Sequence, residues 1–201
     1  DVLESGRHLF VEKPPGVDLA LAEQLRDAAV RADRQMMVGF MKRFATAYRH
    51  VWSVTRQETF GTPRLLTLDY AHVPFDDFRD HLLFMSVHPF DTARWLMGDV
   101  VGGTVHRRTA DGLEVLVATL DHAEGGVSQL NISSCAPRVQ ERLVIYGDNT
   151  MATVDNFVAV EVQHRAASFA DCLDTNPTMA DCWTADLTMP APANDSLTLQ
   201  G

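Results

Sequence analysis

Hydrophobic and polar residues follow two different patterns along this chain of 201 residues, and the change falls at Gly61-Thr62-Pro63. Before that breaker, short apolar runs alternate with segments that repeat at helical spacing. After it, most segments alternate between apolar and polar residues, which is typical of half-buried strands. The pattern therefore predicts an α/β first part and an α+β second part.

The first part is predicted to be a strand–helix–strand unit followed by another helix. Residues 9–11 and 35–40 are short apolar runs bounded by breakers, which predicts two strands. Residues 17–33 repeat apolar side chains at helical spacing, and Asp18 is a candidate N-cap. Two strands joined by one helix should lie parallel, with a right-handed crossover. A second helix is expected over residues 45–57.

The second part is predicted to be an open, mostly antiparallel sheet with helices on one face. Residues 64–73 alternate like a long strand, and residues 81–97 return to helical spacing until Gly98 ends the helix. In the C-terminal tail the pattern weakens, and residues 168–173 are expected to form one or two helical turns. Further strands are predicted, between turn residues, at 100–106, 113–122, 126–133, 141–146 and 151–162.

Composition excludes several classes of protein. The formal net charge is −10 and the pI is near 5.1, with no run of basic residues, so a nucleic-acid partner is not expected. The sequence has no stretch of about 18 or more apolar residues, so no membrane-spanning helix is expected. Three cysteines without metal-type spacing fit a reducing compartment, and we expect a cytoplasmic protein with no metal site.

The first candidate functional residues follow the first predicted strand, in the segment Glu12-Lys13-Pro14-Pro15-Gly16. The carboxyl ends of parallel strands are where open α/β sheets bind their ligands, so Lys13 is placed for a functional role. Proline restricts the residue before it, and the Lys13-Pro14 bond can be cis at modest cost. The alternative is an ordinary surface lysine before a turn.

Three motifs, taken together, resemble the Gfo/Idh/MocA family of NAD(P)-dependent sugar and polyol oxidoreductases. The first is Gly-Arg-His-Leu-Phe-Val-Glu-Lys-Pro at residues 6–14, and the second is Val-Gly-Phe-Met-Lys-Arg-Phe at residues 38–44. The third is Val-His-Pro-Phe-Asp-Thr-Ala-Arg-Trp-Leu-Met-Gly at residues 87–98. Their order and spacing match the family over residues 1–165.

This resemblance implies a division of the chain into three parts. Residues 1–41 would be the terminal βαβ piece of an NAD(P)-binding Rossmann domain. Residues 42–165 would form an α+β domain that covers the substrate and joins copies of the chain into a homo-oligomer through its sheet. Residues 166–201 would be a partly irregular tail.

The resemblance also implies roles for individual residues. Lys13 would contact substrate and nicotinamide, with Glu12 and Pro14 shaping that corner, and His88 would be the general acid/base. An imidazole titrates near neutral pH, and a lysine ammonium can stabilise a developing alkoxide. Among the remaining candidates, Arg43 would lie near the NAD or NADP cofactor, and the positions assigned to a sugar or polyol substrate would be Asp91 and His72.

Each of these assignments has a structural alternative. His88 and His72 could be buried histidines that only support the core, and Asp91 could pair with Arg94. Lys42 and Arg43 could be a solvated pair of charges.

Two departures from the family pattern stand out. The family has an aspartate four residues before the histidine, as its partner, and here that position is Phe84, so Asp80 or His81 would have to substitute. The chain also has no Gly-x-Gly-x-x-Gly turn for the cofactor pyrophosphate, and the family places that turn upstream of Glu-Lys-Pro.

Two hypotheses follow. The first is that the chain carries the catalytic corner of an oxidoreductase whose cofactor-binding half is missing from it, with the glycine-rich strand–turn–helix encoded upstream. The second is that it is a non-catalytic module of the same ancestry that binds a small molecule or mediates oligomerisation. The open face of the sheet leads us to expect self-association in both cases.

Overall fold

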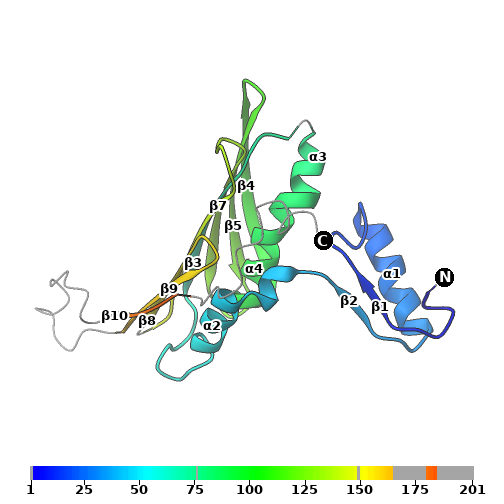
Figure 1. The fold of residues 1–201 in the computed structure, drawn as a ribbon, viewed down its shortest axis with the longest axis horizontal. Coiled ribbons are helices and arrows are strands. Elements are labelled where there is room, and N and C mark those ends of the chain that lie inside the picture. Colours follow the sequence, from blue (N-terminus) through cyan, green and yellow to red (C-terminus); the bar gives the residue numbers. More distant parts are fainter. Residues whose placement is uncertain (1, 76, 149, 165–179, 185–201) are drawn as a thin grey trace, which may run out of the picture.

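A computed structural model describes residues 2–75, 77–148, 150–164 and 180–184. A small βαβ unit lies beside a large sheet whose one face is covered by helices (Figure 1). Among the helices described, none is long and apolar enough to cross a membrane.

The βαβ unit has the predicted form. Strands β1 (Leu9–Val11) and β2 (Met36–Val38) pair in parallel, with Leu9 opposite Met36, and helix α1 (Leu19–Arg31) connects them. Asp18 caps α1, because its side chain accepts a hydrogen bond of 2.8 Å from the amide of Leu21. The capping prediction is therefore confirmed.

The sheet has eight strands in the order β10-β9-β8-β7-β3-β6-β5-β4, and its pairs are antiparallel except for β3 with β6. This confirms an open, mostly antiparallel sheet with helices on one face. The strands are β3 (Leu65–Ala71), β4 (Val100–Ala110), β5 (Leu113–His122), β6 (Val127–Ser133), β7 (Gln140–Tyr146), β8 (Thr150–Asp155), β9 (Ala159–His164) and β10 (Ala180–Thr184).

One predicted strand is wrong, because residues 151–162 do not form a single element. The chain reverses between β8 and β9 through Asn156 and Phe157, whose φ angles of 44° and 70° lie in the left-handed region. Strand β10 falls within the segment predicted to be partly irregular and was not predicted. The helix expected at 168–173 lies outside the described residues.

The helices cover one face of the sheet (Figure 1). They are the 3₁₀ helix η1 (Met41–Phe44), α2 (Thr46–Val54), the short α3 (Phe78–Asp80), the π-helix η2 (His81–Ser86) and α4 (Val87–Met97). The single helix predicted over residues 81–97 is thus a π-helix followed by an α-helix. Gly98, with φ of 90°, ends it as predicted.

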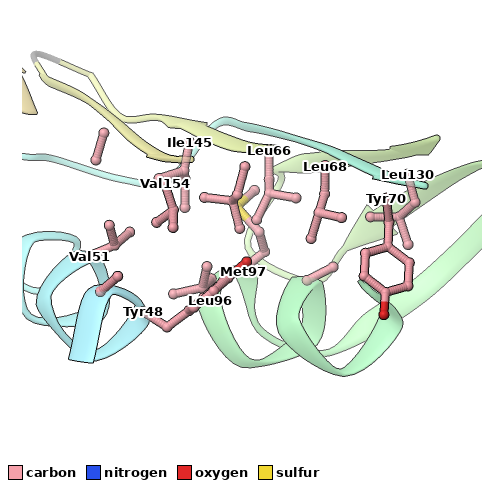
Figure 2. Close-up of a cluster of buried hydrophobic side chains, with 14 of the residues drawn as sticks. Tyr48, Val51, Leu66, Leu68, Tyr70, Leu96, Met97, Leu130, Ile145 and Val154 are labelled. Carbon is pink, nitrogen blue, oxygen red and sulfur yellow. The ribbon is translucent and has the colours of Figure 1, made fainter. Parts of the chain in front are cut away.

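The hydrophobic core lies between this helical layer and the sheet. Figure 2 shows Tyr48 and Val51 of α2 and Leu96 of α4 directed towards the inner residues of the strands. Every second residue of β3 is buried here, at Leu66, Leu68 and Tyr70. No helix among the described residues covers the opposite face, which carries partly exposed apolar side chains, namely Leu65, Val115 and Tyr146.

Candidate functional site

Lys13 is held against the π-helix η2 by a long-range hydrogen bond. Its Nζ donates to the main-chain carbonyl of Phe84 at 2.6 Å and lies 5.9 Å from the centre of the Phe84 ring. The π-register partner of this carbonyl would be residue 89, and Pro89 has no N–H group to compete with Lys13 for it. Partial burial lowers the pKa of Lys13, and the Glu12 carboxylate opposes that shift.

Glu12 and Pro14 define the shape of the corner around Lys13. The Lys13-Pro14 peptide bond is cis, as the sequence allowed. The Glu12 carboxylate lies against the backbone of Gly39, just after β2, so that a Cβ atom there would come within 3.1 Å of both carboxylate oxygens. Gly39 therefore permits the close approach of the two strand ends.

Arg43 and Asp91, which the sequence assigned separately to cofactor and substrate, bind each other. The guanidinium donates from Nε to Asp91 Oδ2 at 2.9 Å and from Nη2 to Oδ1 at 2.5 Å, a bidentate ion pair. The Asp91 side chain is 9% exposed and that of Arg43 is 36% exposed. The alternative partner of Asp91 is excluded, because Arg94 binds Asp99 instead.

His88 lies on the first turn of α4 and is 5% exposed. Desolvation, followed by the positive charges of Lys42 and Lys13, lowers its pKa to about 3. Within the described part of the chain its ring forms no hydrogen bond and has no carboxylate partner. His88 is therefore neutral at pH 7 and able to accept a proton.

Phe84 occupies the position where the family has the aspartate partner of the histidine, and neither Asp80 nor His81 takes over that role. Asp80 lies within the short turn that Asp77 caps, and the Asp80 amide donates to Asp77 Oδ1. His81 turns away into an aromatic cluster, with its ring centre 4.6 Å from that of His72. Phe84 itself is 41% exposed beside Lys13.

His72 belongs to this aromatic cluster. Within the described chain it forms no hydrogen bond, ion pair or ring contact with Lys13, His88 or Asp91. Its ring is fully buried and its Nδ1–H donates to the carbonyl of Val73 at 2.6 Å. Burial lowers the pKa of both His72 and His81, the latter to about 4. The cluster comprises His72, His81, Phe75 and Phe78.

The most deeply buried charge near the site was not predicted. Lys42, which the sequence suggested was solvated or near the cofactor, is 2% exposed and forms an ion pair with Glu141 of β7. Nothing local in the sequence signals this contact, because the two residues are 99 positions apart. As for metals, no group of three or more His, Cys, Asp or Glu in the described ranges could hold an ion.

Comparisons with known proteins agree with this architecture. Residues 48–153 match the model of the GFO/IDH/MocA C-terminal domain, which is more than half of the chain. The chain belongs to the Gfo/Idh/MocA family.

Among its relatives, the myo-inositol 2-dehydrogenase of Thermotoga maritima is 32% identical over 101 residues, or 47% of this chain and 30% of that protein. A dehydrogenase from Chromobacterium violaceum has the same fold, with a TM-score of 0.81 and 21% identity over 98% of this chain and 59% of its own.

An oxidoreductase from Agrobacterium radiobacter, solved with NAD+, L-tartaric acid and magnesium, has a TM-score of 0.73 and 19% identity over 96% of this chain and 58% of its own. The chain spans about half the length of the curated relatives that match most of it, 54% and 52% in two cases.

Proposed function

We propose that this chain forms the substrate-side half of an NAD(P)-dependent oxidoreductase that transfers hydride between the nicotinamide and a sugar, polyol or related hydroxy compound. The observation that carries the proposal is the fixed position of Lys13 on η2, next to the helix that bears His88. In the oxidation of an alcohol, a neutral imidazole can accept the hydroxyl proton and a cation can stabilise the developing alkoxide.

In the proposed reaction His88 accepts the proton of the substrate hydroxyl, and Lys13 stabilises the negative charge that develops on that oxygen. Loss of the proton from the hydroxyl oxygen and of hydride from the carbon that bears it leaves a carbonyl group. A bound NAD+ or NADP+ would accept the hydride. In the reverse direction His88 returns the proton.

The described residues fit one end of such a cofactor. Glu12, Lys13 and Pro14 follow β1, and Lys13 has a partly exposed ammonium at the strand ends. The sequence offers no glycine-rich turn for the pyrophosphate, so that part of the site would come from a Rossmann half outside this chain. We assign residues 1–41 to that domain, residues 42–165 to the substrate domain and residues 166–201 to a tail.

Substrate contacts are proposed for Asp91, through the lone pairs that Arg43 leaves free, while Arg43 faces the cofactor side with its exposed edge. His72 stays a candidate only if the aromatic cluster opens. The uncovered face of the sheet, with Leu65, Val115 and Tyr146, is proposed to join two copies of the chain. A strictly monomeric sedimentation profile at micromolar concentration would contradict that last point.

A second function is favoured by Phe84. An exposed phenyl ring where the family has a carboxylate suits a module that binds a small molecule without turning it over. Such a module would retain ligand binding but show no hydride transfer with any Rossmann partner.

The test is a titration of the chain with NADH and NADPH, followed by nicotinamide fluorescence. We expect saturable binding that weakens in Lys13→Met and persists in the matched control Arg31→Met, which removes an exposed charge from α1. Absence of binding at millimolar cofactor would show that this chain alone is not a dehydrogenase, and the enzyme proposal would then require hydride transfer after the missing Rossmann half is supplied.

A further inference from the structure

Lys42 and Arg43 are consecutive residues of η1, yet only Arg43 keeps contact with solvent. Lys42 is buried with its counter-ion Glu141, whose side chain is 0% exposed. Its Nζ lies 4.4 Å from the ring centre of Tyr70 and 5.1 Å from that of Phe157. An ammonium surrounded by aromatic rings and one carboxylate is a costly arrangement to bury.

Stability alone does not account for these charges. Replacing a buried ion pair by well-packed apolar residues is often neutral or stabilising, because both charges must be desolvated. Here the pair is also incompletely satisfied, since Glu141 Oε1 is buried without a hydrogen-bond partner among the residues described. Burial lowers the pKa of Lys42 and raises that of Glu141, while their mutual attraction opposes both shifts.

The position of the pair links it to the catalytic corner. η1 connects β2, at the end of the βαβ unit, to the helices that cover the sheet. Lys42 ties this segment to β7, and the next residue, Arg43, ties it to Asp91 on α4, three residues after His88. Two adjacent side chains thus fix the connecting segment against both the sheet and the histidine helix.

We propose that Lys42 is a positioning residue of this site: clamped by Glu141, it fixes η1 against β7, and the adjacent Arg43–Asp91 ion pair joins the same segment to α4, the helix that bears His88. The inference deepens the proposed function and rests on it for the role of His88. A neighbouring carboxylate, as at the usual family position, would favour a protonated histidine; buried cations favour the neutral base.

Other groups around α4 are accounted for. β6, which packs on the helix, contributes no titratable side chain, and Asp91 is neutralised by Arg43. The charged and titratable groups of this region are Lys13, Lys42 with its counter-ion Glu141, Arg43, Tyr70 and Asp91, while His81 of η2 turns into the aromatic cluster.

The direct test is an NMR titration of the histidine side chains in the intact chain, with the His88 signal assigned by its loss in His88→Gln. We expect Lys42→Met/Glu141→Leu to raise the titration midpoint of His88 by about one pH unit. Lys42→Arg keeps the charge and should restore the wild-type midpoint, and Arg31→Met should not move it. If His88 stays neutral over the same pH range in the double variant and the wild type, the proposal is wrong.

A second measurement covers the case in which the double variant does not fold. Lys13 and Lys42 are the two lysines of the sequence, so the ¹³Cε spectrum of wild-type protein has two lysine signals, distinguished by Lys13→Met. A charged Lys42 at pH 7 supports the proposal, and a neutral Lys42 overturns it. Neither measurement needs a cofactor, so failure of nicotinamide binding would bear on the proposed function and not on the role of Lys42.

Discussion

Two buried histidines, seven residues apart on successive helices, are both held neutral, but their surroundings differ. His81 is enclosed by His72, Phe75 and Phe78, and its pKa is lowered chiefly by burial. His88 is also desolvated, but the next causes are two lysines, one of them fixed beside the helix by the Phe84 carbonyl. A lowered pKa therefore does not identify a functional histidine by itself. The two lysines near His88 distinguish it from His81, and they support the proposal that His88 is the base.

The largest effect on stability is expected from breaking the buried Lys42–Glu141 ion pair. Glu141→Leu leaves the buried ammonium of Lys42 without its counter-ion, and we expect a loss of about 3–5 kcal/mol in the free energy of unfolding. Urea unfolding monitored by tryptophan fluorescence measures this. Adding Lys42→Met should recover most of the loss, because no uncompensated charge then remains. A single variant as stable as the wild type would show that Lys42 is already neutral.

The Lys42–Glu141 pair also shows which features could not be predicted from the sequence. The βαβ unit was predictable because its apolar periodicity and the Asp18 cap are local signals, and the Lys13 and His88 motifs lie within short segments. Lys42 was not, because its partner Glu141 comes from a distant strand that only the fold brings near.

The errors in local structure have similar physical causes. The turn between β8 and β9 contains no glycine, and Phe157 adopts a positive φ that a bulky residue rarely takes. The turn signal in this segment was Asp155-Asn156, which the apolar residues on both sides outweighed. The π register of η2 was also hidden, because apolar spacing does not separate an α-helix from a single π segment. Pro89 is the one residue whose missing N–H group bears on that register.

A smaller, pH-dependent effect on stability is expected from replacing His81 in the aromatic cluster. The unfolded chain binds a proton at His81 with a pKa near 6.5 and the folded chain only near 4, so the free energy of unfolding falls as pH drops through this window. His81→Phe removes that proton and fits the aromatic surroundings. We expect it to stabilise the chain by about 2 kcal/mol more at pH 5 than at pH 7.

Urea unfolding at the two pH values measures the difference. His106→Phe, on the exposed strand β4, is the matched control and should change stability about equally at both. If His81→Phe behaves like this control, His81 is not held neutral by the cluster.

The smallest effect should come from the ion pair that joins η1 to α4. Arg43→Met leaves the Asp91 carboxylate, which is 9% exposed, with partial access to water, and we expect a loss of about 1–2 kcal/mol in the free energy of unfolding. Arg94→Met breaks an ion pair on the same helix whose side chains are 64% and 75% exposed, and it should cost less than about 0.5 kcal/mol. Equal losses in the two variants would mean that the Arg43–Asp91 pair is no more than a surface contact. Because Arg43 follows Lys42 directly, that result would also remove one of the two anchors that fix η1 beside His88.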